Sequence, residues 1–271
     1  MEKMFSVKAE ALNRFVSEKG CGGVVVAFSG GLDSSTLVAV CHNQLGRRVV
    51  AVTARSPIHP PGMVETAAEI AQEIGVKHLV VETGELLDKN FVENRADRCY
   101  YCKKELLKEL CNLAERLGFK AIFEGTNISE LDGHRPGFKA VLETGNVFSP
   151  FVETGFTRED VRLLAKKLGL STHNKPPEAC LASRIPFGEP ITEEKLLRVA
   201  EAERVVRRFT GVEHLRVRSH GDLARIEVGR DERKKMFDTK TLDKISEELR
   251  RLGFRFVTMD LEGYKTGGAN R

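Results

Sequence analysis

The chain has 271 residues, of which 41% are hydrophobic and 30% charged, so it can build a real core in one large domain or two modest ones. Its net charge of +4 is mild and comes without a long basic run, which permits an anionic small ligand and does not require nucleic acid as a partner. No apolar stretch approaches the roughly 18 residues that span a bilayer, and residues 1–4 begin no signal-peptide core. We therefore expect a cytoplasmic protein with no membrane partner.

Apolar runs alternate with helical patterns along the first two thirds of the chain. Residues 1–20 predict an amphipathic helix. The strand candidates are 24–28, 49–53, 78–82, 121–124 and 147–149. Helical faces lie between them, and one of them, with apolar residues from Leu106 to Leu117, ends at Gly118. This alternation predicts an α/β fold, a parallel sheet with helices on both faces, whose ligands bind at the carboxyl ends of the strands.

The stretch at residues 29–35 separates the first strand candidate from the next helical pattern and reads Ser-Gly-Gly-Leu-Asp-Ser-Ser. The glycines allow a tight turn close to a ligand, and the N–H groups of the helix that follows point at a bound anion. The candidate ATP and Mg²⁺ ligands are Ser29, Gly30, Gly31, Asp33, Ser34 and Ser35. Asp33 is the candidate for Mg²⁺, because its carboxylate suits an ion that bridges phosphates. The Gly-Lys-Ser/Thr ending of a Walker loop is missing, and the stretch resembles the PP-loop of the ATP pyrophosphatases. A plain glycine turn is the alternative.

A helix near 158–168, with the capping pair Thr157 and Asp160, ends the larger part of the chain. An irregular, proline-rich segment follows at 171–189, and the remainder of the chain predicts a smaller α+β unit. Beyond it, Thr192 caps a helix that runs to about Arg208, strands are expected at 214–219, 224–228 and 254–261, and the apolar face from Leu242 to Leu252 marks a last helix. The expected division is an ATP-binding domain at 1–175, a cysteine-bearing inter-domain loop at 176–189, and a small domain for substrate binding or oligomerisation at 190–271.

The cysteines indicate metal binding or catalysis rather than disulfides. Cys99 and Cys102 form a Cys-x-x-Cys pair that precedes a helix at 103–118, and such a pair grips a metal or a cluster or works as a redox pair. Cys180 lies in a proline-stiffened loop with Arg184 close by, which favours the thiolate. Three thiolates can hold three irons of a [4Fe-4S] cluster and leave the fourth open, or make an incomplete zinc site. Unremarkable thiols are the plain alternative for all three. The other cysteines, Cys21, Cys41 and Cys111, are expected to be structural.

Four segments together carry a resemblance to one family. They are residues 29–35, Glu-Gly-Thr-Asn at 124–127, His-Arg-Pro-Gly at 134–137, and Ala-Cys-Leu-Ala-Ser-Arg-Ile-Pro-Phe-Gly at 179–188. On these residues the chain resembles the LarE-type ATP-dependent sacrificial sulfur transferases, which help to build the nickel-pincer nucleotide cofactor of lactate racemase. The segment at 179–188 is specific to that family, whereas many PP-loop enzymes share the segment at 29–35.

The resemblance implies an ATP-dependent sulfurtransferase. ATP adenylates a carboxylate of a pyridinium dicarboxylate mononucleotide, pyrophosphate leaves, and a sulfur nucleophile displaces AMP to leave a thiocarboxylate. In single-cysteine members the cysteine that matches Cys180 gives up its sulfur, while members with three cysteines carry a [4Fe-4S] cluster that can bind an extra sulfide. Cys99, Cys102 and Cys180 are therefore expected to ligate a cluster, with Cys180 as the catalytic residue of a recyclable enzyme. The family likeness also implies a homo-oligomer, a hexamer.

Further positions carry over from the family to this chain. Gly125 and Asn127 would lie near the nucleotide, Arg135 would face the phosphates of ATP, and Arg55 ends the second strand. In the small domain Arg216, Arg218 and Arg184 are expected to hold the phosphate of the mononucleotide, with Glu227 as a candidate metal ligand nearby.

The strand at 214–219 also has a plainer interpretation. Strand periodicity places Arg216 and Arg218 on one face with His214 and His220. From the spacing alone, that face is the solvated side of a half-buried strand. The family likeness favours a phosphate site instead, because a guanidinium group binds phosphate through a planar fork.

Other functions stay open. tRNA 2-thiolation enzymes also join a PP-loop to cysteines, but the sequence has no zinc-ribbon array of Cys-x-x-Cys pairs and no basic, aromatic-rich appendage. A non-catalytic ATP-binding module would give no role to Cys180. An amide-forming PP-loop synthetase would need ammonia delivery, for which the sequence offers no glutaminase domain.

Overall fold

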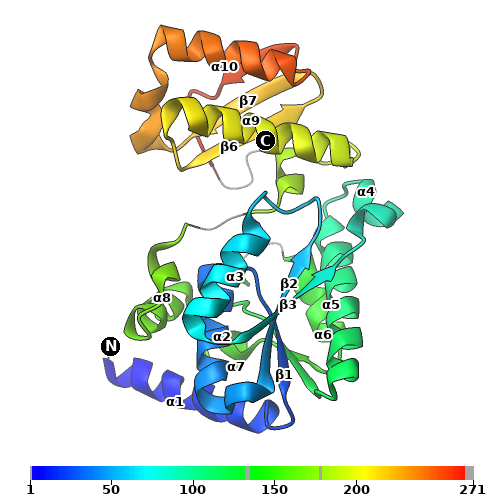
Figure 1. Ribbon diagram of the computed structural model, residues 1–271, viewed down its shortest axis with the longest axis vertical. Coiled ribbons are helices and arrows are strands. Elements are labelled where there is room, and N and C mark those ends of the chain that lie inside the picture. The colour runs from blue at the N-terminus through cyan, green and yellow to red at the C-terminus, as the bar shows by residue number, and fades with distance from the viewer. Residues whose placement is uncertain (1, 132–134, 177–178, 266–271) are drawn as a thin grey trace. The chain divides into compact units, whose positions relative to one another are not determined.

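The computed structural model describes residues 2–131, 135–176 and 179–265, and the chain folds as two compact units (Figure 1). Unit 1 comprises Met1–Ser56, Pro61–Glu85 and Asp97–Glu178, and unit 2 comprises Pro57–Pro60, Leu86–Ala96 and Ala179–Arg271. Two short segments of the first hundred residues thus cluster with the C-terminal part, a feature that no pattern in the sequence indicated. The functional division at 175 and 189 remains a proposal.

Unit 1 is built on a parallel sheet of five strands. Its strands are β1 (Val24–Ala27), β2 (Val49–Arg55), β3 (Lys77–Glu82), β4 (Ala121–Phe123) and β5 (Val147–Phe148). They lie in the order β3-β2-β1-β4-β5, with Ala27 beside Val52 and Val26 beside Phe123. The predicted fold class is confirmed. The strand order reverses between β1 and β4, and in open parallel sheets ligands bind outside the carboxyl ends of the strands at such a point.

Helices cover both faces of this sheet (Figure 1). The helices of unit 1 are α1 (Glu2–Lys19), α2 (Leu32–Leu45), α3 (Met63–Ile74), α5 (Arg98–Leu117), α6 (Pro136–Glu143), α7 (Pro150–Glu153) and α8 (Arg158–Lys167). Val24 and Val26 pack into a cluster with residues of α1, α2, α3, α7 and α8, whereas Val25 packs on the opposite face with α5 and α6. Alternate residues of β1 therefore enter different cores, as the two-residue period of a strand requires.

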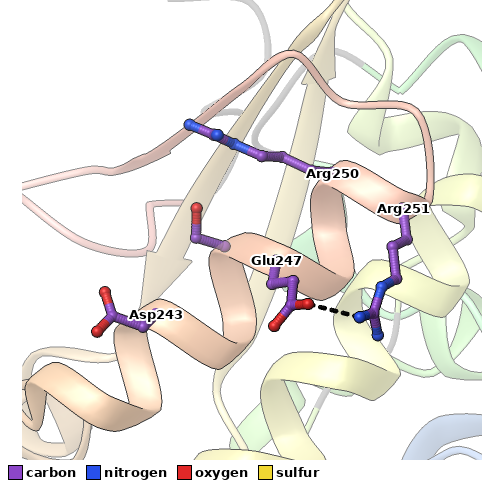
Figure 2. Close-up of a pocket in the computed structure, with 5 residues that line it drawn as sticks. Asp243, Glu247, Arg250 and Arg251 are labelled. Atoms are coloured by element: carbon purple, nitrogen blue, oxygen red, sulfur yellow. Dashed lines mark hydrogen bonds and ion pairs between the residues drawn. The ribbon is translucent and has the colours of Figure 1, made fainter.

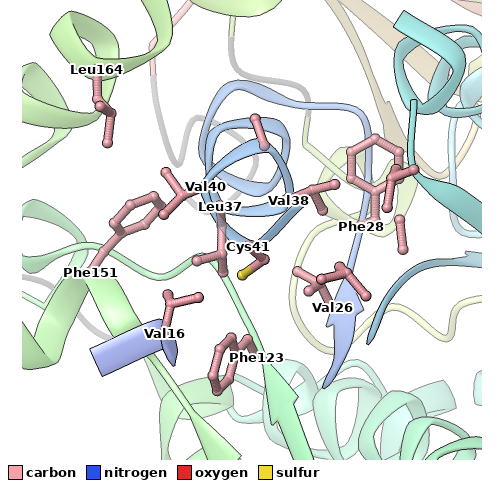
Figure 3. Packing of buried hydrophobic residues seen from close by; sticks show 14 of the residues in the cluster. Val16, Val26, Phe28, Leu37, Val38, Val40, Cys41, Phe123, Phe151 and Leu164 are labelled. Atoms are coloured by element: carbon pink, nitrogen blue, oxygen red, sulfur yellow. The ribbon is translucent and has the colours of Figure 1, made fainter. Parts of the chain in front are cut away.

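The core on the α2 side contains Cys41 (Figure 3). This side chain has no exposed surface and lies among Val16, Leu37 and Phe123. Burial raises the pKa of the Cys41 thiol well above its ordinary range, which keeps it neutral and unreactive. The predicted structural role of this cysteine is confirmed.

Unit 2 holds a three-stranded sheet with two helices. The strands are β6 (Leu215–His220), β7 (Leu223–Val228) and β8 (Phe256–Met259), and the helices of eight or more residues are α9 (Glu193–Thr210) and α10 (Thr239–Arg251). β6 and β7 form an antiparallel hairpin, and β8 joins β7 in parallel. Thr192 caps α9 by accepting a hydrogen bond from the backbone of Lys195, so the predicted helix start is confirmed. The apolar residues of β6 and β7 pack against both helices.

Short helical turns connect these elements. They are α4 (Lys89–Val92), η1 (Gly46–Arg48), η2 (Glu85–Leu87), η3 (Ile128–Glu130), η4 (Ser171–Asn174), η5 (Leu181–Arg184) and η6 (Arg230–Met236). The capping box at α8 is present, because Thr157 and Asp160 bond reciprocally through side chain and backbone. Within the described ranges, every helix is too short or too polar to cross a bilayer.

Candidate functional site

The loop between β1 and α2 is a tight turn that depends on its glycines. Gly30 has a φ of +68°, and a Cβ built there would lie 3.0 Å from the Cα atom of Ala67 in α3. Gly31 is the N-cap of α2 and its N–H donates to Oγ of Ser29 at 3.3 Å. The hydroxyls of Ser29 and Ser34 lie 3.2 Å apart at the helix N-terminus. Donor groups thus converge where the partial positive charge of the helix favours an anion.

The first turn of α2 is joined to the loop after β4. Asn127 is fully buried, and its Nδ2 donates to Oδ1 of Asp33 at 2.8 Å. A Cβ at Gly125 would lie 3.2 Å from the backbone nitrogen of Ser34, so a larger residue there would push the two loops slightly apart. Among the described atoms, Oδ1 of Asn127 and Oγ of Ser35 are buried without a hydrogen-bond partner. The predicted nucleotide residues of β1, α2 and β4 therefore meet at the switch point.

The carboxylate of Asp33 lies in an environment that disfavours its charge. Burial raises the pKa of Asp33, and the hydrogen bond from Asn127 and the positive charges of Arg158 and Arg135 offset only part of this rise. A bound cation would reverse the balance, since it stabilises the ionised carboxylate.

A buried ionic network lies behind the nucleotide residues. Glu124 is 2% exposed and accepts hydrogen bonds from Lys103 Nζ at 3.1 Å, from Thr126 Oγ1 at 2.7 Å, and from Ser149 Oγ. Burial acts to raise the pKa of Glu124, but Lys103 and the two hydroxyls outweigh it and lower the pKa. Lys103 follows Cys102 on α5, so the network fixes the second turn of α5 to the carboxyl end of β4. The sequence analysis missed Lys103 and Ser149, because a lysine and a serine carry no distinctive motif signal.

The Cys-x-x-Cys pair lies inside a helix rather than ahead of it. α5 begins at Arg98, so the expected start at residue 103 is wrong by more than one turn, since no residue from Cys99 to Cys102 breaks a helix. Cys99 is exposed and Cys102 is half-buried. A spacing of three residues puts both thiols on one helix face. A Cβ at Gly137 of α6 would lie 3.1 Å from the carbonyl oxygen of Cys99, so the two helices approach closely there.

The predicted cluster ligands are divided between the two units. Cys99 and Cys102 belong to unit 1 and Cys180 belongs to unit 2. In the part of the chain that the structure describes, no three His, Cys, Asp or Glu side chains gather closely enough to hold a metal ion. The cluster therefore stays a proposal.

The two exposed arginines of the predicted nucleotide site each form an ion pair. Arg55, at the end of β2, pairs with Glu82 at 3.1 Å, and both side chains are largely exposed. Arg135 is the N-cap of α6 and pairs with Glu130 at 2.9 Å, in the turn after Asn127. Its neighbour in the predicted motif, His134, lies outside the described residues.

The loop that carries Cys180 in unit 2 is held by a buried arginine. The carbonyl oxygen of Cys180 accepts hydrogen bonds from Ser183 Oγ at 2.8 Å and from Arg184 Nη1 at 3.0 Å. Arg184 is 2% exposed and donates through Nε and Nη2 to both carboxylate oxygens of Glu203, at 2.8 and 3.1 Å. The guanidinium expected at a substrate phosphate thus binds protein acceptors, and its evident contribution is to fix the loop. Glu203 was missed because its position on α9 reads as an ordinary helix residue.

Arg216 and Arg218 are buried, so the solvated-face interpretation of their strand is wrong. Arg218 donates twice to Glu227, at 3.0 and 2.8 Å, and once to the carbonyl oxygen of Ser183 at 2.9 Å. Arg216 lies over the ring of Tyr264, with 5.1 Å to the ring centre. Burial and the nearby charge of Arg184 lower the pKa of Arg216, although Glu203 and Tyr264 act in the opposite direction. A bound anion would relieve this crowding of positive charge.

Two surface hollows are lined by other residues of the chain. One hollow runs along a single helix, α10 (Figure 2), where Glu247 pairs with Arg251. It is lined by Asp243, Ser246, Glu247, Arg250 and Arg251. A second, in unit 1, is lined by Arg158, Glu159, Arg162, Leu163, Lys166, His173 and Asn174. Neither contains a predicted site residue.

Comparison with known proteins agrees with this geometry. A family model described as NAD synthase matches residues 4–123, which include the loop after β1. The uncharacterized protein slr1717 of Synechocystis sp. is 40% identical over 99% of this chain and 98% of its own length. The pyridinium-3,5-bisthiocarboxylic acid mononucleotide synthase of Lactiplantibacillus plantarum is 35% identical over 91% of this chain and 88% of its own length. The tRNA-specific 2-thiouridylase MnmA of Rickettsia prowazekii is 26% identical over 56% of this chain, which spans about half of that enzyme. The chain therefore belongs to the LarE-type family of PP-loop proteins, together with the synthase of Lactiplantibacillus plantarum.

Proposed function

We propose that this protein converts a carboxylate of a pyridinium dicarboxylate mononucleotide into a thiocarboxylate, at the expense of ATP, in nickel-pincer cofactor biosynthesis. A carboxylate oxygen attacks the α-phosphorus of ATP, and the bond to pyrophosphate breaks. A sulfur nucleophile then attacks the acyl carbon of the adenylate, and the carbon–oxygen bond to AMP breaks. The observation that carries the proposal is the 35% identity to a pyridinium-3,5-bisthiocarboxylic acid mononucleotide synthase over nearly the whole chain.

ATP binding is assigned to the switch point of the sheet in unit 1. The turn at Gly30 and Gly31 and the hydroxyls of Ser29, Ser34 and Ser35 would hold its phosphates, with Arg135, Arg55 and the backbone at Gly125 alongside. Oxygen atoms suit Mg²⁺, which takes only one or two protein carboxylates and completes its shell with water and phosphate. Asp33 fits this description, and the unpartnered Oδ1 of Asn127 beside it is a second oxygen. The ion would neutralise phosphate charge as pyrophosphate leaves.

The mononucleotide is assigned to unit 2. Arg216 is the principal candidate for its phosphate, because it lies buried near the positive charges of Arg184 and Arg218, and a bound phosphate would offset their repulsion. Arg218 would add charge from beside it, and Arg184 would act through the Cys180 loop that it binds. Glu227 already accepts bonds from Arg218 and Arg225, so we assign it to holding these arginines rather than to a metal.

Sulfur chemistry is assigned to Cys180, Cys99 and Cys102. Soft thiolates are the ligands that iron–sulfur clusters take, and two of the three lie three residues apart near the N-terminus of α5, one exposed and one half-buried. A cluster held by three thiolates keeps one iron open to carry a sulfide, which would spare the sulfur of Cys180. With no cluster, Cys180 itself would be the sulfur donor: its thiolate would form a thioester with the acyl group, and loss of the Cα proton with cleavage of the Cβ–sulfur bond would release the thiocarboxylate and leave dehydroalanine at position 180.

The Cys180 loop is hydrogen-bonded to a short segment of unit 2 that follows β2 in the chain. Leu181 donates its backbone N–H to the carbonyl oxygen of Ile58 at 2.7 Å, within unit 2. Ile58 follows Arg55, the last residue of β2, by three positions, and three residues reach at most about 11 Å.

The decisive experiment is anaerobic turnover followed by mass spectrometry. Protein, Mg²⁺, ATP and the dicarboxylate mononucleotide should yield AMP, pyrophosphate and a substrate that has exchanged oxygen for sulfur. Cys180→Ala should still release pyrophosphate but form no thiocarboxylate. Arg216→Ala should raise KM for the mononucleotide and leave KM for ATP unchanged, whereas Arg208→Ala, on the exposed side of α9, should change neither. Normal sulfur transfer by Cys180→Ala, or thiolation of tRNA in place of the mononucleotide, would contradict the proposal. The hexameric state expected from the family also remains a proposal.

A further inference from the structure

Helix α8 of unit 1 has two sides of different chemistry. One side is buried in the core that also contains residues of α2, through Val161, Leu164 and Ala165. Another side carries a row of three cations at a spacing of four residues, Arg158, Arg162 and Lys166. A charged outer side by itself is ordinary for a helix at a protein surface.

The row of cations lines a hollow in unit 1. His173 and Asn174, from the turn η4, line it as well, and its volume is about 440 Å³. This volume lies within the range of about 300–1,000 Å³ that is typical of sites for small molecules. Glu159 is the one carboxylate among the lining residues, against three permanently positive side chains. The hollow therefore favours an anion.

The cations of the row are not neutralised by neighbouring carboxylates. Within the described ranges, none of the three takes part in an ion pair. Glu159 precedes Arg162 by three positions, the same spacing as in the ion pair of Glu201 with Arg204, and yet these two side chains do not pair. The donor groups of the row are thus available to a ligand.

Arg158 connects the hollow to the loop where we propose that ATP binds. Its backbone N–H donates to Oγ of Ser129 at 3.1 Å, in the turn directly after Asn127. Burial raises the pKa of Asp33, and the positive charge of Arg158 opposes this rise. The guanidinium group therefore lies within electrostatic range of the carboxylate on the first turn of α2.

A second contact joins the hollow to the same loop. Asn174 is followed by Lys175, whose Nζ donates to the carbonyl oxygen of Gly30 at 3.2 Å. η4 also packs against α2. The hollow and the glycine turn thus adjoin each other within one compact unit.

We propose that the hollow on α8 receives pyrophosphate after its cleavage from ATP and holds it before its release. Pyrophosphate is a compact polyanion, and guanidinium groups bind phosphate oxygens through a planar fork. The cleavage step is the one already described, and no bond forms or breaks in the hollow. This inference rests on the proposed function, because that function supplies the pyrophosphate.

The test measures pyrophosphate binding without turnover. The full chain is titrated with inorganic pyrophosphate and Mg²⁺ in a calorimeter, in the absence of ATP. The double variant Arg162→Gln with Lys166→Gln should raise Kd for pyrophosphate about tenfold, because two charge-assisted contacts are lost. Glu159→Gln removes the opposing carboxylate and should lower Kd. In turnover, added pyrophosphate should inhibit the double variant less, while KM for the mononucleotide stays unchanged.

The matched control is the double variant Lys139→Gln with Lys167→Gln. It removes the same net charge from unit 1, but Lys139 lies on α6 and Lys167 lies over the ring of Phe5, outside the hollow. Its Kd for pyrophosphate should remain that of the wild type.

Three results would overturn the inference: no binding of pyrophosphate by the wild type, an unchanged Kd in the variant of Arg162 and Lys166, or equal weakening in the control. A protein that gives one of these results and still makes thiocarboxylate keeps the proposed function. A protein that shows the expected change in Kd and makes no thiocarboxylate keeps the pyrophosphate site and loses the proposed function.

Discussion

Asn127 donates a hydrogen bond to Asp33 at 2.8 Å across the point where the strand order of the sheet reverses. The two residues are 94 positions apart in the chain, one after β1 and the other after β4. Their contact holds a buried carboxylate, whose pKa burial raises, at the edge of the sheet where we propose that ATP binds. When no cation is bound, the ionised carboxylate of Asp33 therefore destabilises the fold.

Asp33→Asn should therefore stabilise the unliganded protein at neutral pH. Because the pKa of Asp33 is raised on folding, the wild type loses stability as the pH rises from the unfolded value, about 4, through the folded value. The variant has no such loss. Its unfolding temperature should exceed that of the wild type at pH 7, and the difference should vanish below about pH 4.

The same substitution should abolish the use of ATP. Pyrophosphate release with Mg²⁺ and ATP should fall at least about 100-fold, because a group that holds the metal at the phosphates is lost. Asp243→Asn, on the exposed face of α10, is the control and should change neither property. A variant that is stabilised yet still releases pyrophosphate would remove Asp33 from the proposed metal site.

Lys103→Met should destabilise unit 1. The substitution leaves Glu124 buried without its cation, which should cost about 1–3 kcal/mol of unfolding free energy at pH 7. The folded pKa of Glu124 is lowered, so the stability that this carboxylate contributes is present above its unfolded pKa and is lost as the pH falls through its folded pKa. The difference in unfolding free energy between Lys103→Met and the wild type should therefore shrink as the pH falls.

Urea unfolding at several pH values measures this effect. Lys108→Met, which removes an exposed lysine five residues further along α5, should cost less than about 0.5 kcal/mol. Equal losses of unfolding free energy in both variants would mean that the buried Lys103–Glu124 ion pair stabilises the fold no more than an exposed ion pair does.

These examples indicate what the sequence could predict. The strand at 24–28 and the turn at Ser29–Ser35 were predictable, because an apolar run and paired glycines are local signals. The family resemblance implied that Gly125 and Asn127 lie near the nucleotide, and their meeting with Asp33 agrees with the rule that ligands of a parallel sheet bind at the carboxyl ends of its strands.

What the sequence could not predict depends on tertiary packing. Strand period placed Arg216 and Arg218 on one face, but only the contacts with Glu227 and Tyr264 show that this face is buried. The hydrogen bonds from the buried side chain of Asn94 to the carbonyl oxygens of Pro186 and Glu189 were missed, because a single asparagine in a polar segment carries no periodic signal.

Glu203→Gln should loosen the Cys180 loop. A neutral amide leaves the guanidinium of Arg184 buried without a charged partner, which should cost about 3–5 kcal/mol. Because Arg184 also binds the carbonyl groups of Ala179 and Cys180, the loop should open and Cys180 should react faster with iodoacetamide. Glu201→Gln, on the same helix but in an exposed pair with Arg204, should leave the alkylation rate unchanged. An unaltered rate in Glu203→Gln would show that Arg184 does not restrain the loop.

Cys99→Ser should distinguish a cluster from a sacrificed cysteine. If Cys99, Cys102 and Cys180 ligate iron, anaerobically prepared wild type should contain iron and absorb visible light, and the serine variant should lose both, because a hydroxyl is a poor ligand for such a cluster. Cys111→Ser is the matched control, since this thiol lies on the same helix and contacts Asn146. It should keep the iron and the absorption of the wild type. Iron-free wild type that transfers one sulfur per chain and then stops would make Cys180 the sulfur donor.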